Sequence, residues 1–293
     1  MVVYKPKKGL GLYHIVGTLT LYNVILILAI IFVRSYVLTS LLKISLFILN
    51  VYQLRYLVLQ LSLKYALDDE NIYILSLLRK YKISYAELES YKLLDEKING
   101  IKLTGFGTSY FALGKSVIKN IGTTNMFVTS NRGVIYLKLK DMNYAISPEM
   151  LLDFKDNLEK NNIHQANWEG KINKEIGLHK DKNFMISLIT VSIIISVLTL
   201  TPFILYLFNK LPGKMPLNFD STFIPVDYGT GKQFAFNQMI YGVLNMAILF
   251  CMYYASHFYA KYDKKSANRF IHFSLVIAAA FLIIQIRILI TFR

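Results

Sequence analysis

The chain has 293 residues, of which 54% are hydrophobic, with a formal net charge of +15 and a mean hydropathy of +0.41. Soluble domains average about 45–50% apolar residues, so the composition indicates a membrane protein. Residues 64–182 carry 18 basic and 15 acidic side chains, whereas the remainder carries 15 basic and three acidic ones. The excess charge therefore lies beside apolar runs, as in membrane flanks, and we expect no nucleic-acid partner.

Residues that could hold a metal or a nucleotide are scarce. The five histidines show no ligand spacing such as HExxH. The LGKS stretch at 113–116 lacks the glycine that a phosphate-binding loop needs five residues before Gly114, because Ser109 stands there. The single cysteine, Cys251, lies in an apolar run and excludes an internal disulfide. We therefore expect no cofactor.

Four apolar stretches without charge are long enough to cross a membrane as helices. Crossing takes about 20 residues, because the hydrocarbon layer is about 30 Å thick and a helix rises about 1.5 Å per residue. These stretches are residues 9–33, 183–209, 233–260 and 270–286, the last of which continues past one arginine to residue 290.

A fifth apolar stretch, residues 36–60, contains Lys43, Asn50, Gln53 and Arg55. Its two charged side chains lie toward opposite ends, where long side chains can extend to an interface. We predict that this stretch also spans, so that residues 34–35 form nearly the whole turn of a helical hairpin.

The positions of Lys and Arg predict the sidedness. Lys5, Lys7 and Lys8 precede the first helix, and short cytoplasmic flanks collect basic residues, so we expect a cytoplasmic N-terminus. Five crossings then place residues 64–182 in the cytoplasm, and residues 209–236 and the C-terminus outside. If residues 36–60 did not span, every later segment would change sides.

The middle of the chain has the pattern of β-strands. Alternating apolar runs are separated by turn signals such as the Asn-Gly pair at 99–100. The predicted strands are residues 72–78, 90–94, 126–130, 134–139 and 144–147.

A helix is predicted to follow these strands. Ser147 is a suitable N-cap and Pro148 fits the first helical position. Leu151, Phe154 and Leu158 lie three and four residues apart and form one apolar stripe. Several strands followed by one amphipathic helix predict a small bent barrel with the helix at its open end.

Four sequence blocks in this region carry a family resemblance. They are YALDDENIYI, KISYAELESYKLL, the glycine-rich GFGTSYFALGKSVIKNIGTTNMFVTSNRGVIYLKL and AISPEMLLDFKDNL. Residues 64–160 thereby resemble the bacterial PH-like domains of membrane proteins. The resemblance implies a PH-like β-barrel with a C-terminal capping helix, and a role in binding a cytoplasmic protein or in self-association. It does not imply phosphoinositide binding.

Residues 161–182 are polar and charged, and we predict a linker. Trp168, Ile172 and Ile176 are four residues apart, which would suit a short interfacial helix. Packing of the tryptophan against the barrel is the alternative.

Residues 209–236 form the predicted exported loop. Pro212, Pro216 and Pro225 remove backbone donors and fix φ, so neither neighbouring helix can continue through it. Unpaired backbone groups cannot lie against lipid, so the loop must be wet or buried in protein. Asp227 and Lys232 could pair there, or each could bind an external ligand.

The order of residues in this loop is similar to that of the DUF1648 family of bacterial membrane proteins, over residues 200–250. The matching positions are Leu211, Pro212, Pro216, Phe219, Pro225, Asp227 and Lys232. The family usually has a histidine where this chain has Asn218, so a role for an exported imidazole is not carried over. Some members are immunity or signalling proteins against peptide toxins. The ligand-facing candidates are therefore Pro212, Pro216, Asn218, Phe219, Asp220, Pro225, Asp227 and Lys232.

Polar side chains within the spans are costly and are functional candidates by default. Arg287 is expected to meet Asp220 or Asp227, or simply to extend into the interface. Asn23 and Asn50 can hydrogen-bond across the first hairpin, as structural contacts. The four candidates of this kind are Asn23, Asn50, Gln285 and Arg287.

The sequence thus predicts an α+β integral membrane protein with five transmembrane helices and a cytoplasmic PH-like domain. Its parts are a transmembrane hairpin (1–63), the PH-like domain (64–160), a linker (161–182) and a three-helix membrane region (183–293). The preferred function is non-catalytic: regulation, or immunity through an extracellular peptide that the exported loop senses. A component of a membrane transporter is the alternative. An enzyme is least favoured, because the spans hold no nucleophile–base pair and no paired carboxylates.

Overall fold

The computed structural model describes residues 1–140, 142–168, 170 and 177–292. The chain divides into two compact units. The β-rich unit comprises Met1–Asn23 and Ile48–Asn173, and the helical unit comprises Val24–Phe47 and Lys174–Arg293.

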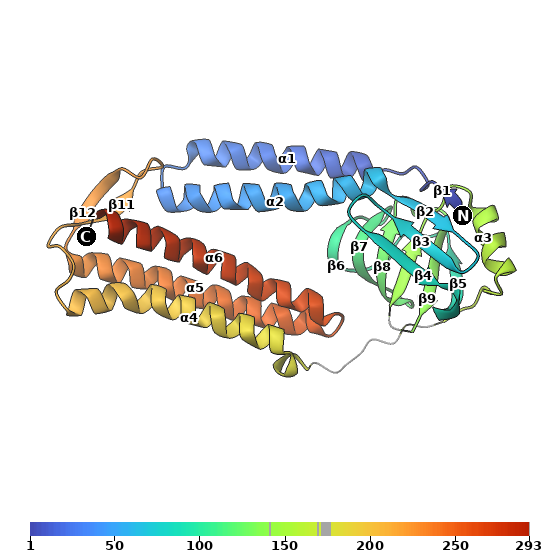
Figure 1. The fold of residues 1–293 in the computed structure, drawn as a ribbon. Helices are drawn as coiled ribbons and strands as arrows, with labels where there is room; N and C mark the ends of the chain where they lie inside the picture. Colours follow the sequence, from blue (N-terminus) through green and yellow to red (C-terminus); the bar gives the residue numbers. More distant parts are fainter. Residues whose placement is uncertain (141, 169, 171–176, 293) are drawn as a thin grey trace. The chain divides into compact units, whose positions relative to one another are not determined.

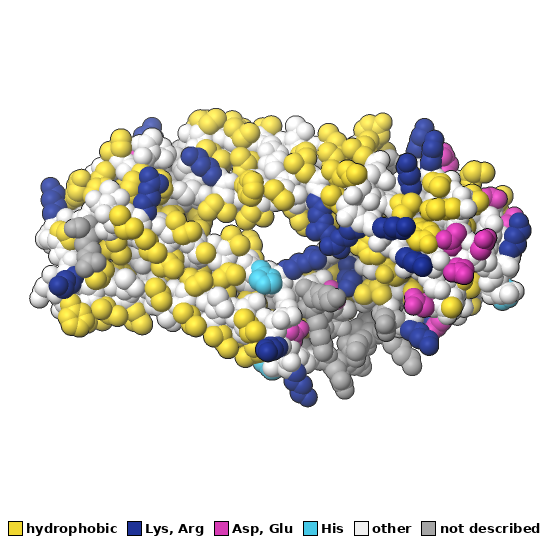
Figure 2. Space-filling model, in the orientation of Figure 1, with side chains coloured by type: hydrophobic (Ala, Val, Ile, Leu, Met, Phe, Trp, Pro, Cys, Tyr) yellow, Lys and Arg dark blue, Asp and Glu magenta, His cyan; other side chains and the backbone are white. Residues whose placement is uncertain are grey.

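Five long helices match the five predicted stretches and are apolar enough to cross a membrane, which indicates a membrane protein. Hydrophobic side chains cover their visible faces, and Lys and Arg side chains gather mostly near their ends (Figure 2). In Figure 1 the helices are α1 (Gly11–Phe32), α2 (Tyr36–Ser62), α4 (Lys182–Leu207), α5 (Gly231–Ala260) and α6 (Lys264–Phe292).

The first sheet of the β-rich unit has four antiparallel strands in the order β1-β2-β3-β4. They are β1 (Val2–Tyr4), β2 (Lys64–Leu67), β3 (Asn71–Leu75) and β4 (Lys80–Ser84). The extreme N-terminus is therefore an edge strand, and the sequence analysis missed it. The Tyr4 hydroxyl also donates to Asp153 Oδ2 at 2.5 Å, which ties this edge to the helix that follows the strands.

The second sheet has six strands in the order β5-β9-β10-β8-β7-β6, antiparallel except for the β10–β8 pair. The five predicted runs fall in β3, β5, β8, β9 and β10. The strands are β5 (Leu88–Leu94), β6 (Gly100–Gly107), β7 (Ala112–Ile118), β8 (Gly122–Val128), β9 (Val134–Leu139) and β10 (Asn143–Ile146).

Both sheets contribute to one apolar core, but the described strands form no closed barrel. The predicted bent barrel is not closed at the junction of β4 and β5, because these consecutive strands belong to different sheets. There the Ser84 hydroxyl accepts a hydrogen bond from the Ala86 N–H at 3.3 Å and caps a 3₁₀ turn at Tyr85–Glu87. The turn redirects the chain, so that β5 pairs with β9 rather than with β4.

The helix after the strands, α3 (Leu151–Lys160), is confirmed, and Phe154 and Leu158 of its apolar stripe are buried. Its predicted N-cap is wrong. Ser147 is fully buried, and its hydroxyl accepts from the Thr129 N–H at 2.9 Å. The hydroxyl therefore joins two neighbouring chain segments instead of starting the helix, which begins four residues later.

The polar segment 161–182 is only partly described. Trp168 packs against an apolar cluster of the second sheet that includes Ile118 and Met126, as in the alternative prediction. The predicted interfacial helix through Ile172 and Ile176 lies outside the described residues.

Helices α4, α5 and α6 pack into a bundle with its own apolar core. Asp181 begins α4 by accepting from the N–H groups of Asn183 and Phe184 at 2.9 and 3.2 Å. A Cβ atom at Gly242 of α5 would lie 2.1 Å from the Thr199 hydroxyl of α4. Only glycine therefore permits this close crossing.

Candidate functional site

The predicted exported loop folds into a two-stranded hairpin of β11 (Met215–Phe219) and β12 (Pro225–Gly229). Asp220 shapes its tip: Oδ1 accepts from the Ile224 N–H at 2.9 Å, and from the Thr222 hydroxyl and N–H at 2.7 and 2.8 Å. The Ile224 N–H, followed by the Thr222 hydroxyl, holds the pKa of Asp220 below its ordinary value. This carboxylate is thus engaged in holding the turn.

Aromatic rings hold the hairpin against the end of α6. Phe223, which has a positive φ of 71°, stacks on Phe219 with ring centroids 4.7 Å apart. Phe292 contacts both rings, at 5.6 and 5.9 Å. The Arg287 guanidinium lies 4.1 Å from the centre of the Phe223 ring and 5.3 Å from that of Tyr36, and it donates to the Tyr36 hydroxyl. We call these five residues the arginine–aromatic cluster.

The structure brings Arg287 to the hairpin, but against rings rather than against Asp220 or Asp227. Cation–π contacts of this kind stabilise by about 0.5–2 kcal/mol, depending on how dry the site is. Arg287 is therefore a residue that fixes the hairpin in place.

The polar candidates on the strands lie at the exposed surface. Asn218 Nδ2 donates to Asp227 Oδ2 at 3.0 Å, so Asp227 pairs across the hairpin with an amide instead of with Lys232. Lys232 is exposed in the first turn of α5, which begins with a capping box between Thr230 and Gln233.

The three predicted loop prolines have different positions. Pro212 is half-buried before the hairpin, Pro216 is buried in β11, and Pro225 opens β12. Proline cannot donate to a sheet ladder, so prolines at these positions limit how far the two-stranded sheet extends.

Strand β12 of the hairpin exposes large apolar side chains. Val226 and Tyr228 are 62% and 50% exposed, and Ile224, immediately before the strand, is 61% exposed. Lys214 Nζ lies 4.8 Å from the centre of the Tyr228 ring. In the described part of the chain, β12 pairs only with β11.

A second group of candidates lies inside the bundle, at a break in the backbone ladder of α4. Pro202 lacks an N–H, so the carbonyl of Leu198, four residues earlier, loses its helical donor. Gln285 Nε2 of α6 donates to that carbonyl at 2.8 Å, and it lies 3.4 Å from Gln238 Oε1 of α5. All three helices thus meet at this amide site.

The amide site retains one unsatisfied acceptor. Gln285 is 1% exposed, and its Oε1 has no hydrogen-bond partner among the described residues. Asn245, also buried, donates to the Tyr241 carbonyl of its own helix at 2.8 Å. The arrangement can accept hydrogen bonds, and no group in it is placed for acid–base chemistry.

The first hairpin contains the predicted amide pair. Asn23 and Asn50 exchange two hydrogen bonds, of 3.0 and 2.8 Å, between α1 and α2. The prediction of a contact across this hairpin is confirmed.

Sequence reasoning missed Gln238 and the aromatic partners of Arg287. The signal for Gln238 was available: an amide within an apolar span, on a helix next to one that a proline interrupts. Tyr36 carried no such signal, because 251 positions separate it from Arg287. Among the described residues, no three His, Cys, Asp or Glu side chains lie close enough together to hold a metal ion.

Comparisons with known proteins bear on the β-rich unit and on the whole chain. Residues 63–162 match the bacterial PH domain family, in agreement with the resemblance seen over 64–160. An uncharacterized protein of Clostridium acetobutylicum is 41% identical over 294 aligned positions, which cover 100% of this chain and 99% of that protein. No solved structure matches the chain.

Proposed function

Because the chain belongs to the same family as this Clostridium acetobutylicum protein and carries a bacterial PH domain, we propose that it is a non-catalytic, membrane-spanning sensor. In this proposal the N-terminus and the PH domain are cytoplasmic, and the hairpin and the C-terminus lie outside. The PH domain contacts a cytoplasmic protein or a second copy of the chain. The hairpin is the element that meets an extracellular peptide.

Strand β12 of the hairpin is the observation that carries the proposal. It pairs on one side only, and the apolar side chains of Val226, Tyr228 and the preceding Ile224 are exposed. Extended peptides bind such edges by adding a strand, and alternate side chains then provide specificity. The arginine–aromatic cluster keeps the edge in a fixed position against α6, which lowers the entropic cost of binding.

The resemblance of residues 200–250 to the DUF1648 family supports an immunity or regulatory role, in which the sensed molecule is a peptide toxin. This support is by analogy. The hairpin geometry adds that an extended peptide could pair with the free edge of β12.

The function is tested by deleting the gene and exposing the cells to antimicrobial peptides of neighbouring strains. We expect greater sensitivity to at least one peptide, with protection restored by the wild-type chain but not by Val226→Lys. The matched control is Ile101→Lys, which changes a 50% exposed strand residue of the PH domain. Equal sensitivity of deleted and complemented cells to every peptide would argue against the immunity role.

The sidedness is tested with single cysteines in a Cys251→Ser background. We expect Ser221→Cys, at the hairpin tip, to react with an impermeant maleimide in intact cells. Lys155→Cys, on α3, should react only after lysis. The reverse pattern would place the hairpin inside and exclude an extracellular ligand.

A transporter component is the second candidate, and the amide site favours it. Interrupted helices with freed backbone carbonyls are elements from which carriers build substrate sites. Substrate-dependent flux in proteoliposomes that is lost in Gln285→Leu would support this function. Peptide protection without flux would support the sensor.

A further inference from the structure

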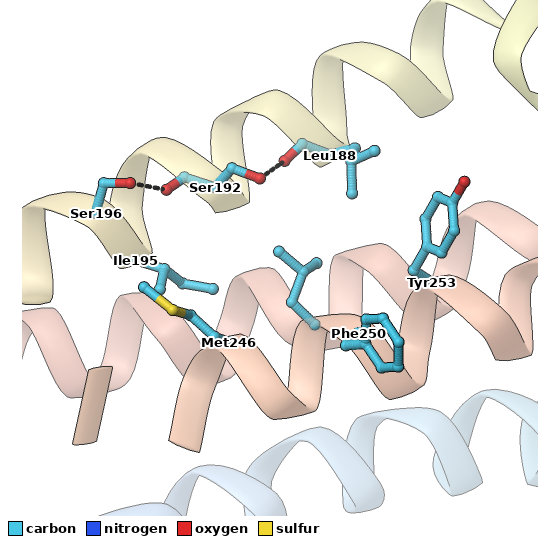
Figure 3. Close-up of a pocket in the computed structure, with 8 residues that line it drawn as sticks. Leu188, Ser192, Ile195, Ser196, Met246, Phe250 and Tyr253 are labelled. Carbon is cyan, nitrogen blue, oxygen red and sulfur yellow. Dashed lines mark hydrogen bonds between the residues drawn. The ribbon is translucent and has the colours of Figure 1, made fainter. Parts of the chain in front are cut away.

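An apolar groove of about 290 Å³ runs between α4 and α5, away from both the hairpin and the amide site. Figure 3 shows Ser192 and Ser196 along α4, with Met246, Phe250 and Tyr253 projecting from α5. The two serines are the smallest side chains of the lining, and they leave the space that a leucine would fill.

The serine hydroxyls of the groove are already satisfied. The Ser192 hydroxyl donates to the Leu188 carbonyl and the Ser196 hydroxyl to the Ser192 carbonyl, both at 2.9 Å. No free donor therefore faces the groove from these serines. The surface that remains is apolar, and it includes the 63% exposed Phe250. Such a groove suits a hydrocarbon chain.

One end of the groove leads to a pair of imidazoles. Tyr253 lies at this end, and its ring centroid is 4.4 Å from that of His257, one helical turn further along α5. His257 in turn lies 5.4 Å from His179, which precedes α4. His257 Nδ1 is 3.0 Å from the Tyr253 carbonyl, so Nδ1 carries the proton and Nε2 faces away from that carbonyl.

Lys180, Lys182 and Lys261 lie at the same end of the bundle. The carboxylates that the structure describes there, Asp181 and Asp263, accept hydrogen bonds at the starts of α4 and α6. Within the described part of the chain, no carboxylate lies at ion-pair distance from Lys180, Lys182 or Lys261. Figure 2 shows histidine and basic side chains together where α4 begins.

We propose that the groove and this basic end bind one anionic phospholipid. An acyl chain lies along Ser192 and Ser196, and the phosphate lies beside His179, His257 and Lys182. Basic pockets between apolar helices bind anionic headgroups in this way. The distance from the helix start to the groove also fits a phospholipid, because Ser192 lies ten residues, or about 15 Å of helix, from Lys182. The phosphate thus stays at the helix ends while the chain lies at hydrocarbon depth.

A helix of a second copy fits the groove less well. Its apolar surface would cover the Tyr253 end and bring no negative charge to the lysines. An anionic lipid satisfies both parts of the site with one molecule.

The proposal is tested on the full chain in detergent, by native mass spectrometry with added dioleoyl phosphatidylglycerol or dioleoyl phosphatidylcholine. We expect one phosphatidylglycerol to be retained at least tenfold more strongly than phosphatidylcholine. Ser192→Phe, which fills the groove, should abolish retention of both lipids. The double variant His179→Gln, His257→Gln should keep chain binding but lose the preference for the anionic headgroup.

Matched controls separate this site from general lipid contact. Thr190→Phe adds the same ring to an exposed, self-bonded hydroxyl position of α4 outside the groove, and His272→Gln removes an imidazole outside the pair. Both should bind like the wild type. Equal retention of the two lipids by the wild type, or equal losses in Ser192→Phe and Thr190→Phe, would overturn the proposal. A change of oligomeric state in Ser192→Phe without loss of lipid would instead assign the groove to a second copy.

Discussion

Tyr65 in the β-rich unit and Gln285 in the helical unit are both buried polar side chains, but their surroundings differ. The Tyr65 hydroxyl donates to the Phe127 carbonyl at 2.6 Å and accepts from the Ser147 N–H at 3.3 Å. Burial raises the pKa of Tyr65 to about 12, so the hydroxyl stays neutral at physiological pH. Gln285 bonds through Nε2 to the Leu198 carbonyl, while its Oε1 has no partner among the described residues.

The difference follows from how each backbone uses its own donors and acceptors. Strand ends and turns leave N–H and C=O groups that side chains such as Tyr65 can reach. The interior carbonyls of a continuous helix are already bonded within the helix, whereas a break leaves one of them without its donor. Gln285 lies at such a break, opposite the carbonyl that Pro202 leaves without a donor. The Gln285 amide thus marks a backbone defect, whereas Tyr65 joins chain segments.

The largest expected effect lies in the apolar core of the β-rich unit. Phe154 is fully buried and contacts the Tyr4 ring edge-on at 5.1 Å. Truncating a buried phenylalanine costs about 3–5 kcal/mol, because apolar contacts are lost and a cavity remains. We expect Phe154→Ala to lower the free energy of unfolding by this amount in urea titrations of the full chain, followed by Trp168 fluorescence.

Leu152→Ala, at a 75% exposed position of the same helix, is the control and should change little. The comparison of the two units also predicts that the helical circular dichroism of Phe154→Ala persists after the fluorescence transition. Simultaneous loss of both signals would show that the units do not unfold separately.

The next largest effect tests the backbone defect directly. Gln285→Leu leaves the Leu198 carbonyl without a donor, and an unmet buried acceptor costs about 1–3 kcal/mol. In Pro202→Ala the new N–H can bond to that carbonyl, so Gln285→Leu should then cost much less. A double-mutant cycle in steric-trap or denaturant unfolding measures this coupling.

If the effects of Gln285→Leu and Pro202→Ala on the free energy of unfolding were strictly additive, Gln285 would not be replacing the helical donor that Pro202 lacks. Gln238→Leu offers a comparison, since its contact with Gln285 is longer, at 3.4 Å, and its loss should cost less.

The sequence predicted those features that follow from local pattern. Span length, the strands β3, β5, β8, β9 and β10, and the stripe of Phe154 and Leu158 depend on composition and periodicity within a few residues of one another. The Asn23–Asn50 contact was predictable because a short turn puts the two helices side by side.

Features that depend on packing between distant segments were not predictable in the same way. Ser147 looks like an N-cap in sequence, but a buried Thr129 N–H is its actual donor. Arg287 was expected to meet a carboxylate or to extend into the interface, yet Asp220 is already bonded by its own turn and Asp227 by Asn218. The guanidinium therefore meets aromatic rings, a choice that no local pattern shows.

A smaller effect is expected at the arginine–aromatic cluster. Arg287→Lys keeps the charge but loses the planar group that stacks on Phe223 and Tyr36. We expect a loss of about 0.5–2 kcal/mol, confined to the hairpin. It should appear as faster hydrogen exchange across residues 215–229, with no change in the PH domain. Arg269→Lys, on the same helix, is the control, and an equal effect there would show that the stacking contributes nothing.

The smallest effect is the pH dependence of the hairpin tip. The folded pKa of Asp220 lies below the ordinary carboxyl value of about 3.9, because the Ile224 N–H and the Thr222 hydroxyl bind its charged form. The stability that Asp220 gives the hairpin is therefore fully present above the pKa that its carboxyl has in the unfolded chain. This stability is lost as the pH falls through the lower pKa that the carboxyl has in the folded chain. The amide resonances of Thr222 and Ile224 should shift together below about pH 3.9 in NMR spectra of the full chain in nanodiscs.

Asp220→Asn should remove this titration while Asp227→Asn preserves it, because the hydrogen bond of Asp227 runs across the exposed strands to Asn218. If Asp227→Asn removed it instead, the tip would be held by the strand pair and not by its own carboxylate.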